Sequence, residues 1–237
     1  MKIIAGDGNA YGYRKITADL REDYNLIINH KKVHRLCSEL GVLRKRPQIT
    51  SNKKKKRVKK TRIDGPNQLW EMDLKYGYID KKNRFFFQLS IIDVHDRVII
   101  DYHLGLSATA KDAKRVLKNA LKKRGLINSS VKPAIRTDNG PQFTAKVFQK
   151  AVDELRISHE MIPVRTPNLI AHIEGFHSIL EDECYSRHEF KDFSHVYKVV
   201  TDFIKFYNFR RRHGSLNYTP PEKYHLQVTK ESINLAA

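Results

Sequence analysis

Apolar residues run together or alternate along five stretches of the chain, in the way that is typical of β-strands. The stretch from Phe85 to Ile92 is almost continuously apolar, as is expected of a central strand that is covered on both faces. Short polar segments at residues 81–83 and 95–96 predict tight turns. The strands that the pattern predicts are Leu69–Ile79, Arg84–Asp93, Arg97–Leu104, Pro133–Thr137 and Ile157–Met161.

Apolar residues at helical spacing separate the later strands and follow the last one. The clearest helical pattern runs from Thr109 to Arg124 and is ended by Gly125. The remaining helices of this part are expected over Ala145–Leu155, from Thr166 onward, and from Phe193 to Tyr207. The order strand-strand-strand-helix-strand-helix-strand-helix predicts an α/β fold, with helices on the faces of a mixed five-stranded sheet.

A second, smaller helical pattern occupies residues 11–46. One helix is expected over Tyr13–Asp23, and Asn29 can cap another that begins at His30 and stops at Gly41. The apolar positions of the second helix are Val33, Leu36, Cys37 and Leu40. Its outward residues Lys31, Lys32 and Arg35 form a basic face that fits a DNA major groove, although such a face is also common on a merely solvated helix.

The net charge of +19 is unevenly distributed along the chain. Residues 1–66 hold 18 Lys and Arg against 6 Asp and Glu, whereas residues 67–237 hold 27 against 20. A basic N-terminal part before a more balanced body is typical of proteins that bind nucleic acid. We therefore divide the chain into a helix-turn-helix-like unit at 1–48, a basic linker at 49–66, a globular body with a C-terminal helix at 67–226, and a tail at 227–237.

The linker contains the most basic run in the chain. Eight of the ten residues from 53 to 62 are Lys or Arg, and such a run repels itself and cannot be buried. We expect it to stay extended until it meets phosphates. The DNA contacts expected here are Lys53, Lys54, Lys55, Lys56 and Arg57.

Several function classes find no support in the sequence. Cys37 and Cys184 are the only cysteines, so neither a disulfide framework nor a zinc site is expected. No apolar run reaches the ~18 residues that a membrane span needs, and the first residues lack a signal-peptide pattern. We expect a cytoplasmic, nucleoid-associated protein.

Three acidic residues lie within or directly after predicted strands and helices, where a charged side chain often has a functional role. Asp73 lies within a predicted strand, Asp138 directly follows another, and Glu174 lies within a helical pattern after a gap of 35 residues. Carboxylates at the ends of neighbouring strands, faced by one from a helix, can bind two Mg²⁺ or Mn²⁺ ions about 3.5–4 Å apart for displacement at phosphate. In so basic a chain, DNA or RNA is the expected substrate.

Each of these acids also has a simpler interpretation. Strand alternation puts Glu71 on the same face as Asp73, so Glu71 competes for the metal-binding role. The segment Thr137–Gly140 around Asp138 is an ordinary turn sequence. Glu174 belongs to a polar helical stripe that would usually face solvent. Asp93, Asp96 and Asp101 lie near predicted turns, where structural roles suffice.

At these residues the chain resembles a known family. It is similar to the second-reading-frame product (OrfB) of bacterial insertion-sequence transposases of the frameshifting type, which share the retroviral integrase catalytic core. The matching stretches are Tyr11–Ile16, His30–Leu36, Pro66–Asp73, Thr137–Phe143, Glu174–Leu180 and Tyr207–Glu222. Any one of them is weak, but six in order over residues 11–225 are specific.

The resemblance implies a ribonuclease H-like fold and a catalytic, metal-binding triad of Asp73, Asp138 and Glu174, with two ions once DNA is bound. It implies metal-dependent cleavage and strand transfer at the ends of an insertion sequence. The implied partners are double-stranded DNA as element ends and target, further copies of the chain in the active complex, and the upstream-frame product as a fusion. No membrane is implied.

The sequence departs from this family in two places. Many relatives carry a basic residue seven positions after the catalytic glutamate, where this chain has Glu181. The stretch Asn168–Ala171 also departs from the small and polar residues usual before the catalytic glutamate. In addition, a helix normally precedes the position of Tyr11 in this family. Two other functions remain open: a non-catalytic DNA-binding regulator of transposition, and a structure-specific nuclease without strand transfer.

The segment after the last long helix supplies one more expectation. Phe203, Phe206 and Tyr207 continue the apolar side of that helix, so this stretch is expected to pack on the sheet. Arg210, Arg211 and Arg212 would then project toward DNA phosphates beside the site, unless they are merely solvated.

Overall fold

The computed structural model describes residues 2–44, 62–163 and 167–236. Its centre is a sheet in the order β3-β2-β1-β4-β5. The first three strands pair antiparallel, whereas β4 and β5 run parallel to β1. The strands are β1 (Leu69–Ile79), β2 (Arg84–Asp93), β3 (Ile99–Gly105), β4 (Ala134–Thr137) and β5 (His159–Met161). The mixed five-stranded sheet predicted from the sequence is therefore confirmed.

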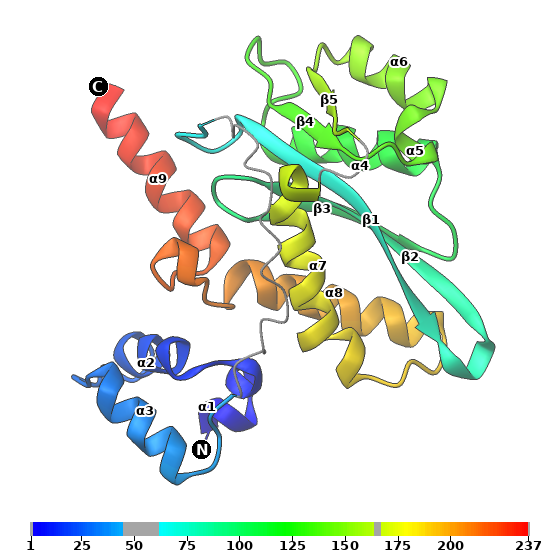
Figure 1. Ribbon diagram of the computed structural model, residues 1–237. Helices are drawn as coiled ribbons and strands as arrows, with labels where there is room; N and C mark the ends of the chain where they lie inside the picture. The colour runs from blue at the N-terminus through cyan, green and yellow to red at the C-terminus, as the bar shows by residue number, and fades with distance from the viewer. Residues whose placement is uncertain (1, 45–61, 164–166, 237) are drawn as a thin grey trace.

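Helices cover both faces of this sheet (Figure 1). The apolar cluster on one face contains Leu89, Ile91 and the inward side of α4, and the cluster on the other contains Phe86, Ile92 and α7 and α8. The long helices of this part are α4 (Ala110–Lys123), α6 (Lys146–Glu154), α7 (Ala171–Glu183), α8 (Phe193–Phe209) and α9 (Pro221–Ala236), with the short α5 (Pro141–Thr144) before α6. The 3-10 turns are η1 (Asp7–Ala10), η2 (Asp80–Lys82), η3 (Pro167–Ile170), η4 (Tyr185–Arg187) and η5 (Gly214–Leu216).

Local sequence explains where several of these elements begin and turn. Thr109 and Asp112 form a reciprocal capping box at the start of α4. Asn83 adopts the left-handed conformation (φ 45°) that closes the β1–β2 hairpin. The third strand begins at Ile99, two residues later than predicted, because Arg97 is in a turn with φ 64°. Helix α9 continues to Ala236, through most of the stretch that we set apart as a tail.

The N-terminal unit contains α1 (Lys2–Ala5), α2 (Tyr13–Glu22) and α3 (His30–Glu39). Asn29 caps α3 as predicted, since its side-chain oxygen accepts a hydrogen bond from the backbone N–H of Lys31 at 2.9 Å. Val33 and Cys37 are buried against α2, but Leu36 and Leu40 are exposed. In so small a unit only one stripe of α3 faces its neighbour.

Two adjacent arginines lie where the N-terminal unit meets the body of the protein, and the second of them connects the two. The guanidinium of Arg211 pairs with both carboxylate oxygens of Glu183, at the end of α7, at 2.6 Å. That of Arg212 pairs with acids of and beside α2: Asp19, Glu22 at 3.0 Å and Asp23 at 3.0 Å. The unit therefore lies beside the end of α8 and the start of α9 (Figure 1).

The expectation that Arg211 and Arg212 project toward DNA is wrong. Both residues are buried, and their charges are already paired with acids. The sequence pattern missed this because the partners of Arg212 lie almost 200 residues earlier in the chain. Arg210 alone of the three is exposed. Tyr207 is buried, as predicted.

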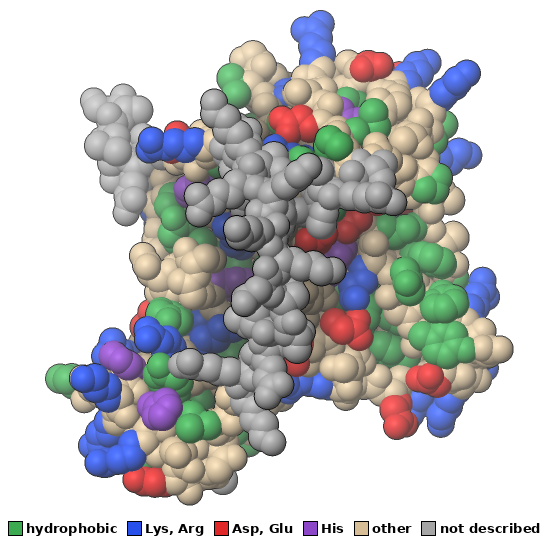
Figure 2. Space-filling view, in the orientation of Figure 1, with side chains coloured by type: hydrophobic (Ala, Val, Ile, Leu, Met, Phe, Trp, Pro, Cys, Tyr) green, Lys and Arg blue, Asp and Glu red, His purple; other side chains and the backbone are tan. Residues whose placement is uncertain are grey.

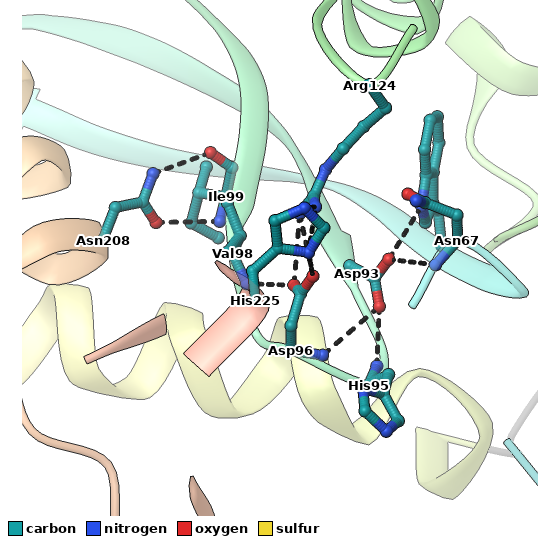
Figure 3. A network of polar contacts seen from close by, with 10 residues as sticks. Asn67, Asp93, His95, Asp96, Val98, Ile99, Arg124, Asn208 and His225 are labelled. Carbon is teal, nitrogen blue, oxygen red and sulfur yellow. Dashed lines mark hydrogen bonds and ion pairs between the residues drawn. The ribbon is translucent and has the colours of Figure 1, made fainter. Parts of the chain in front are cut away.

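A polar network fixes the sheet end opposite the β1–β2 hairpin (Figure 3). The Asp93 carboxylate accepts hydrogen bonds from the backbone of Asn67 and the indole of Trp70, at 2.7 and 3.1 Å. Burial and then repulsion by Asp96 raise the pKa of Asp93. Asp96 is paired with Arg124 of the loop after α4 at 3.0 Å and with His225 of α9 at 2.6 Å. Both acids thus have structural roles.

We predict that Arg212→Ala lowers the free energy of unfolding by about 3–5 kcal/mol, because it removes the cation that is paired with the buried Asp19. Lys205→Ala, at an exposed position of α8, is the matched control and should change stability by less than about 0.5 kcal/mol. Urea unfolding of both variants checks this. Equal stability of the two would mean that the pairing around Arg212 does not hold the N-terminal unit.

Candidate active site

The register of the sheet brings two of the predicted acids together. The last β1–β4 pair is Met72 with Thr137, so Asp73 and Asp138 are the next residues on neighbouring parallel strands. Such strands lie about 4.8 Å apart. Asp73 and Asp138 are therefore side by side at the point where β4 ends and β1 continues alone.

Helix α7 crosses the same face of β1 and brings the third acid. Ile173, Phe176 and Leu180 bury its apolar side in the core, as predicted. Glu174 lies in its first turn and is half-buried. The charge of Glu174 acts on Asp73, as does that of Asp138. The three predicted residues thus converge on one region.

The pKa of Asp73 reflects this convergence. Burial, and then repulsion by the carboxylates of Asp138 and Glu174, raise the pKa of Asp73 to about 7, against a lowering by the hydrogen bond from the Leu74 backbone N–H at 2.8 Å. A carboxyl group with a pKa near neutrality in a cluster of acids is a common feature of functional sites.

Glu71, the competing carboxylate, has a different partner. It is fully buried, and its Oε2 accepts hydrogen bonds from the backbone N–H groups of His172 and Ile173 at 2.9 and 2.8 Å. Its Oε1 lies 2.9 Å from Nδ1 of His172. Glu71 therefore satisfies the first turn of α7, where N–H groups lack helical partners and the helix dipole is positive.

Two further residues of β1 also contact side chains of α7. Asp73 Oδ2 lies 3.5 Å from Nδ1 of His177, and Lys75 Nζ lies 2.7 Å from Glu181. Burial, and then the charge of Lys75, lower the pKa of His177 to about 3, so its ring is neutral at neutral pH. The acid at position 181 is thus compensated by a cation from β1.

The loop after β4 holds Asp138 through a close backbone approach. The Gly140 N–H donates to Asp138 Oδ1 at 2.9 Å. A Cβ at position 140 would lie 2.4 Å from the Gln142 amide and 2.9 Å from that same oxygen. A larger residue at position 140 would displace the side chains of Gln142 and Asp138, which gives the glycine of the Thr137–Gly140 turn a steric reason.

The donor set of the region is suited to a hard divalent cation. Its three carboxylates offer only oxygen ligands, which Mg²⁺ and Mn²⁺ prefer. Within residues 2–44, 62–163 and 167–236, no three His, Cys, Asp or Glu side chains form a closed group able to hold an ion. Asp73, Asp138 and Glu174 surround a common region without forming a finished coordination sphere.

The other predicted site residues lie elsewhere. Lys31, Lys32 and Arg35 are exposed on α3, where Arg35 also pairs with Glu39 at 3.4 Å. The residues Lys53–Arg57 lie outside the described part of the chain. No helix in the described residues is long and apolar enough to span a membrane.

Sequence reasoning missed the structural roles of three residues at the site. These are Glu71, which caps α7, and Lys75 and His177, which form contacts between β1 and α7. Strand alternation placed Glu71 on the face of Asp73. It could not show that α7 lies across that face.

Comparison with protein families assigns most of the chain. Two integrase core domain models match residues 64–167 and 155–221. A helix-turn-helix-like domain model matches residues 1–49.

Several insertion-sequence proteins are similar over nearly the whole chain. An uncharacterized 39.2 kDa protein of insertion element IS476 from Xanthomonas euvesicatoria is 28% identical over 98% of this chain, which spans 65% of that protein's length. The putative transposase InsK for IS150 from Escherichia coli K12 is 29% identical, covering 92% of this chain and 78% of its own.

Solved structures show the same fold. The simian T-cell lymphotropic virus intasome in complex with a PP2A regulatory subunit contains a chain with a TM-score of 0.56 and 18% identity, covering 92% of this chain and 71% of that one. The catalytic domain of Mos1 mariner transposase has a TM-score of 0.51 and 15% identity, covering 69% and 76%. The predicted ribonuclease H-like fold is thereby confirmed.

Glu71 and Asp73 should respond in opposite ways to loss of charge. Glu71→Gln should lower the free energy of unfolding by about 1–3 kcal/mol, since an amide cannot satisfy every donor around it. Asp73→Asn should leave stability unchanged or raise it, because the buried Asp73 charge is repelled by its neighbours. Urea unfolding in the presence of EDTA measures both. A destabilised Asp73→Asn together with an unaffected Glu71→Gln would reverse our assignment.

Proposed function

The chain belongs to the integrase core family together with the insertion-sequence transposases that it resembles, and on that premise we propose that it is a DNA transposase. It cuts DNA strands at the ends of an insertion sequence and joins them to a target, as a polynucleotidyl transferase that uses divalent metal ions. The observation that carries this proposal is the convergence of Asp73, Asp138 and Glu174, with the pKa of Asp73 raised to about 7 by burial and by the other two.

Each acid has its own role in this proposal. Asp73 and Asp138 would hold one Mg²⁺ or Mn²⁺ ion, and Asp73 and Glu174 would hold the other. Ions bound there would activate water or a 3′-hydroxyl and stabilise the leaving 3′-oxygen. The repulsion that raises the pKa of Asp73 supports this role, because a cation among the three carboxylates would relieve it.

The residues around the acids keep the site in shape. Glu71 accepts hydrogen bonds from the first turn of α7 and so positions Glu174 relative to β1. The backbone N–H of Gly140 donates a hydrogen bond to the Asp138 carboxylate and so restricts its orientation. The neutral, buried ring of His177 fills the space beside Asp73. The protein thus keeps three carboxylates in one region, and bound ions would draw them into a complete coordination sphere.

Double-stranded DNA is the proposed partner, held by residues outside the acidic cluster. The exposed face of Lys31, Lys32 and Arg35 on α3 would contact the element ends. The basic run Lys53–Arg57 and the exposed Arg210 would add phosphate contacts without reading sequence. We keep the proposed boundaries at residues 48 and 66, since they separate the DNA-binding unit from the catalytic body.

The active assembly is proposed to be larger than this chain. Because the IS476 relative is longer than the matched region, a fusion with an upstream-frame product remains part of the proposal. We also propose a homo-oligomer on DNA, in the bacterial cytoplasm and on the nucleoid.

Loss of any one carboxylate should abolish cleavage. On DNA carrying the element's own terminal repeats, Asp73→Asn, Asp138→Asn and Glu174→Gln should each reduce Mg²⁺-dependent strand cleavage by about 100-fold or more while end binding persists. Asp153→Asn, at an exposed acid of α6, is the matched control and should cleave normally, and EDTA should stop it.

The products of the same assay separate the alternatives. Joined strands indicate a transposase, and cleavage without joining indicates a structure-specific nuclease. Binding without metal-dependent cleavage by the unsubstituted protein would leave only the regulator. Normal cleavage by Glu174→Gln would refute the triad.

The basic face of α3 generates a separate prediction. Replacing Lys31, Lys32 and Arg35 by Ser should reduce the slope of log affinity against log salt by up to about 0.9 per lost phosphate contact on duplex DNA. Replacing Lys111, Lys118 and Lys122, on the exposed side of α4, is the charge-matched control. Equal slopes for the two variants would mean that α3 does not bind DNA.

A further inference from the structure

The candidate active site opens onto a free strand edge. Strand β4 pairs with β1 only from Leu69 to Met72. From Asp73 to Ile79, β2 is the only strand among the described residues that pairs with β1. The edge therefore begins at the first of the three acids and continues to the tip of the β1–β2 hairpin, which projects away from the N-terminal unit (Figure 1).

A groove of about 570 Å³ follows this edge. At one end it is lined by His177, which lies beside Asp73. At the other end it is lined by Tyr78 and Phe85 of the hairpin. Asp73 to Tyr78 is five residues, or about 17 Å of extended chain, the length of roughly five stacked nucleotides.

Aromatic rings are unusually exposed along the groove. Tyr76, Tyr78 and Phe85 are 63%, 37% and 51% exposed. They also contact one another, with ring centroids of Phe85 at 5.6 Å from Tyr76 and 5.1 Å from Tyr78. Figure 2 shows hydrophobic side chains gathered over this hairpin. A contiguous exposed aromatic cluster marks a binding surface rather than a solvated one.

Positive charge accompanies the rings. Lys81, Lys82 and Arg84 are exposed at the hairpin tip, with Asp80 as the acid among them. Lys75 lines the groove near the acids, paired with Glu181 and lying 5.5 Å from the centroid of the Tyr185 ring. Cations interleaved with exposed aromatic rings are the chemistry that binds single-stranded nucleic acid: bases stack on the rings and phosphates meet the cations.

We propose that this groove holds a single DNA strand, the unpaired nucleotides next to the phosphate at the acidic cluster. Bases would stack on Tyr76 and Phe85, while Lys81, Lys82 and Arg84 would neutralise the backbone. The inference rests on the proposed function, since it adds to that site a track for the strand being cut or joined. Helix α3 would bind the duplex DNA.

A free strand edge also has another potential occupant. A second copy of the chain can add a strand to such an edge through backbone hydrogen bonds. Three features favour DNA: the excess of cations at the tip, the exposed rings, and the end of the groove at His177, which contacts Asp73. An interface between copies is the competing outcome of the test.

The test measures binding of the full chain to a short fluorescein-labelled oligothymidine in EDTA, by fluorescence anisotropy. The double variant Tyr76→Ala and Phe85→Ala should lose at least about fivefold in affinity for each ring. Tyr76→Phe should bind normally, because it keeps the ring. Tyr197→Ala removes a comparably exposed ring from α8 and should also bind normally. Duplex affinity should be unchanged in all of them.

Oligothymidine affinity of the double variant equal to that of Tyr197→Ala would overturn the proposal. So would an equal loss on single strand and duplex, or a shift to monomer in sedimentation with oligothymidine affinity intact. Because EDTA prevents cleavage, the groove is tested apart from the triad. Normal cleavage by Glu174→Gln would remove the proposed function while leaving the binding result in place.

Discussion

The hydrogen bonds from the start of α7 to the buried carboxylate of Glu71 are the interaction on which the site depends. They fix the start of α7 against β1. Beyond this point, every second residue of β1 faces a residue about one helical turn further along α7. Two residues further along β1, Asp73 faces His177, and two further again, Lys75 faces Glu181. This anchor holds the first turn of α7, which carries Glu174, against the strand that carries Asp73.

The other end of α7 is held by a second charged contact. Glu183 receives both guanidinium bonds of Arg211, and the next residue, Arg212, binds the acids of the N-terminal unit. The helix that carries Glu174 is thus connected through two adjacent residues to the helices that we expect to bind DNA. A buried charge that loses its partner is costly, so this connection should resist separation.

Acidic residues have three different roles on this small sheet, and their surroundings decide which. Glu71 and Asp93 accept hydrogen bonds from several backbone or side-chain donors, so their role is structural. Asp96 is paired with the Arg124 guanidinium and contacts the His225 ring. Asp73 has a single backbone donor and two acidic neighbours, so its charge is left for a cation to stabilise.

The sequence by itself determined the strands, most helices and the cap at Asn29, because these follow from periodicity and local side-chain chemistry. It also restricted the candidate ligands to a few acids. Only the tertiary structure separated Glu71 from Asp73, since alternation puts both on one face and the deciding donors, His172 and Ile173, lie about 100 residues away. The arginines at 211 and 212 were misjudged for the same reason: burial and charge pairing depend on segments that meet only after folding.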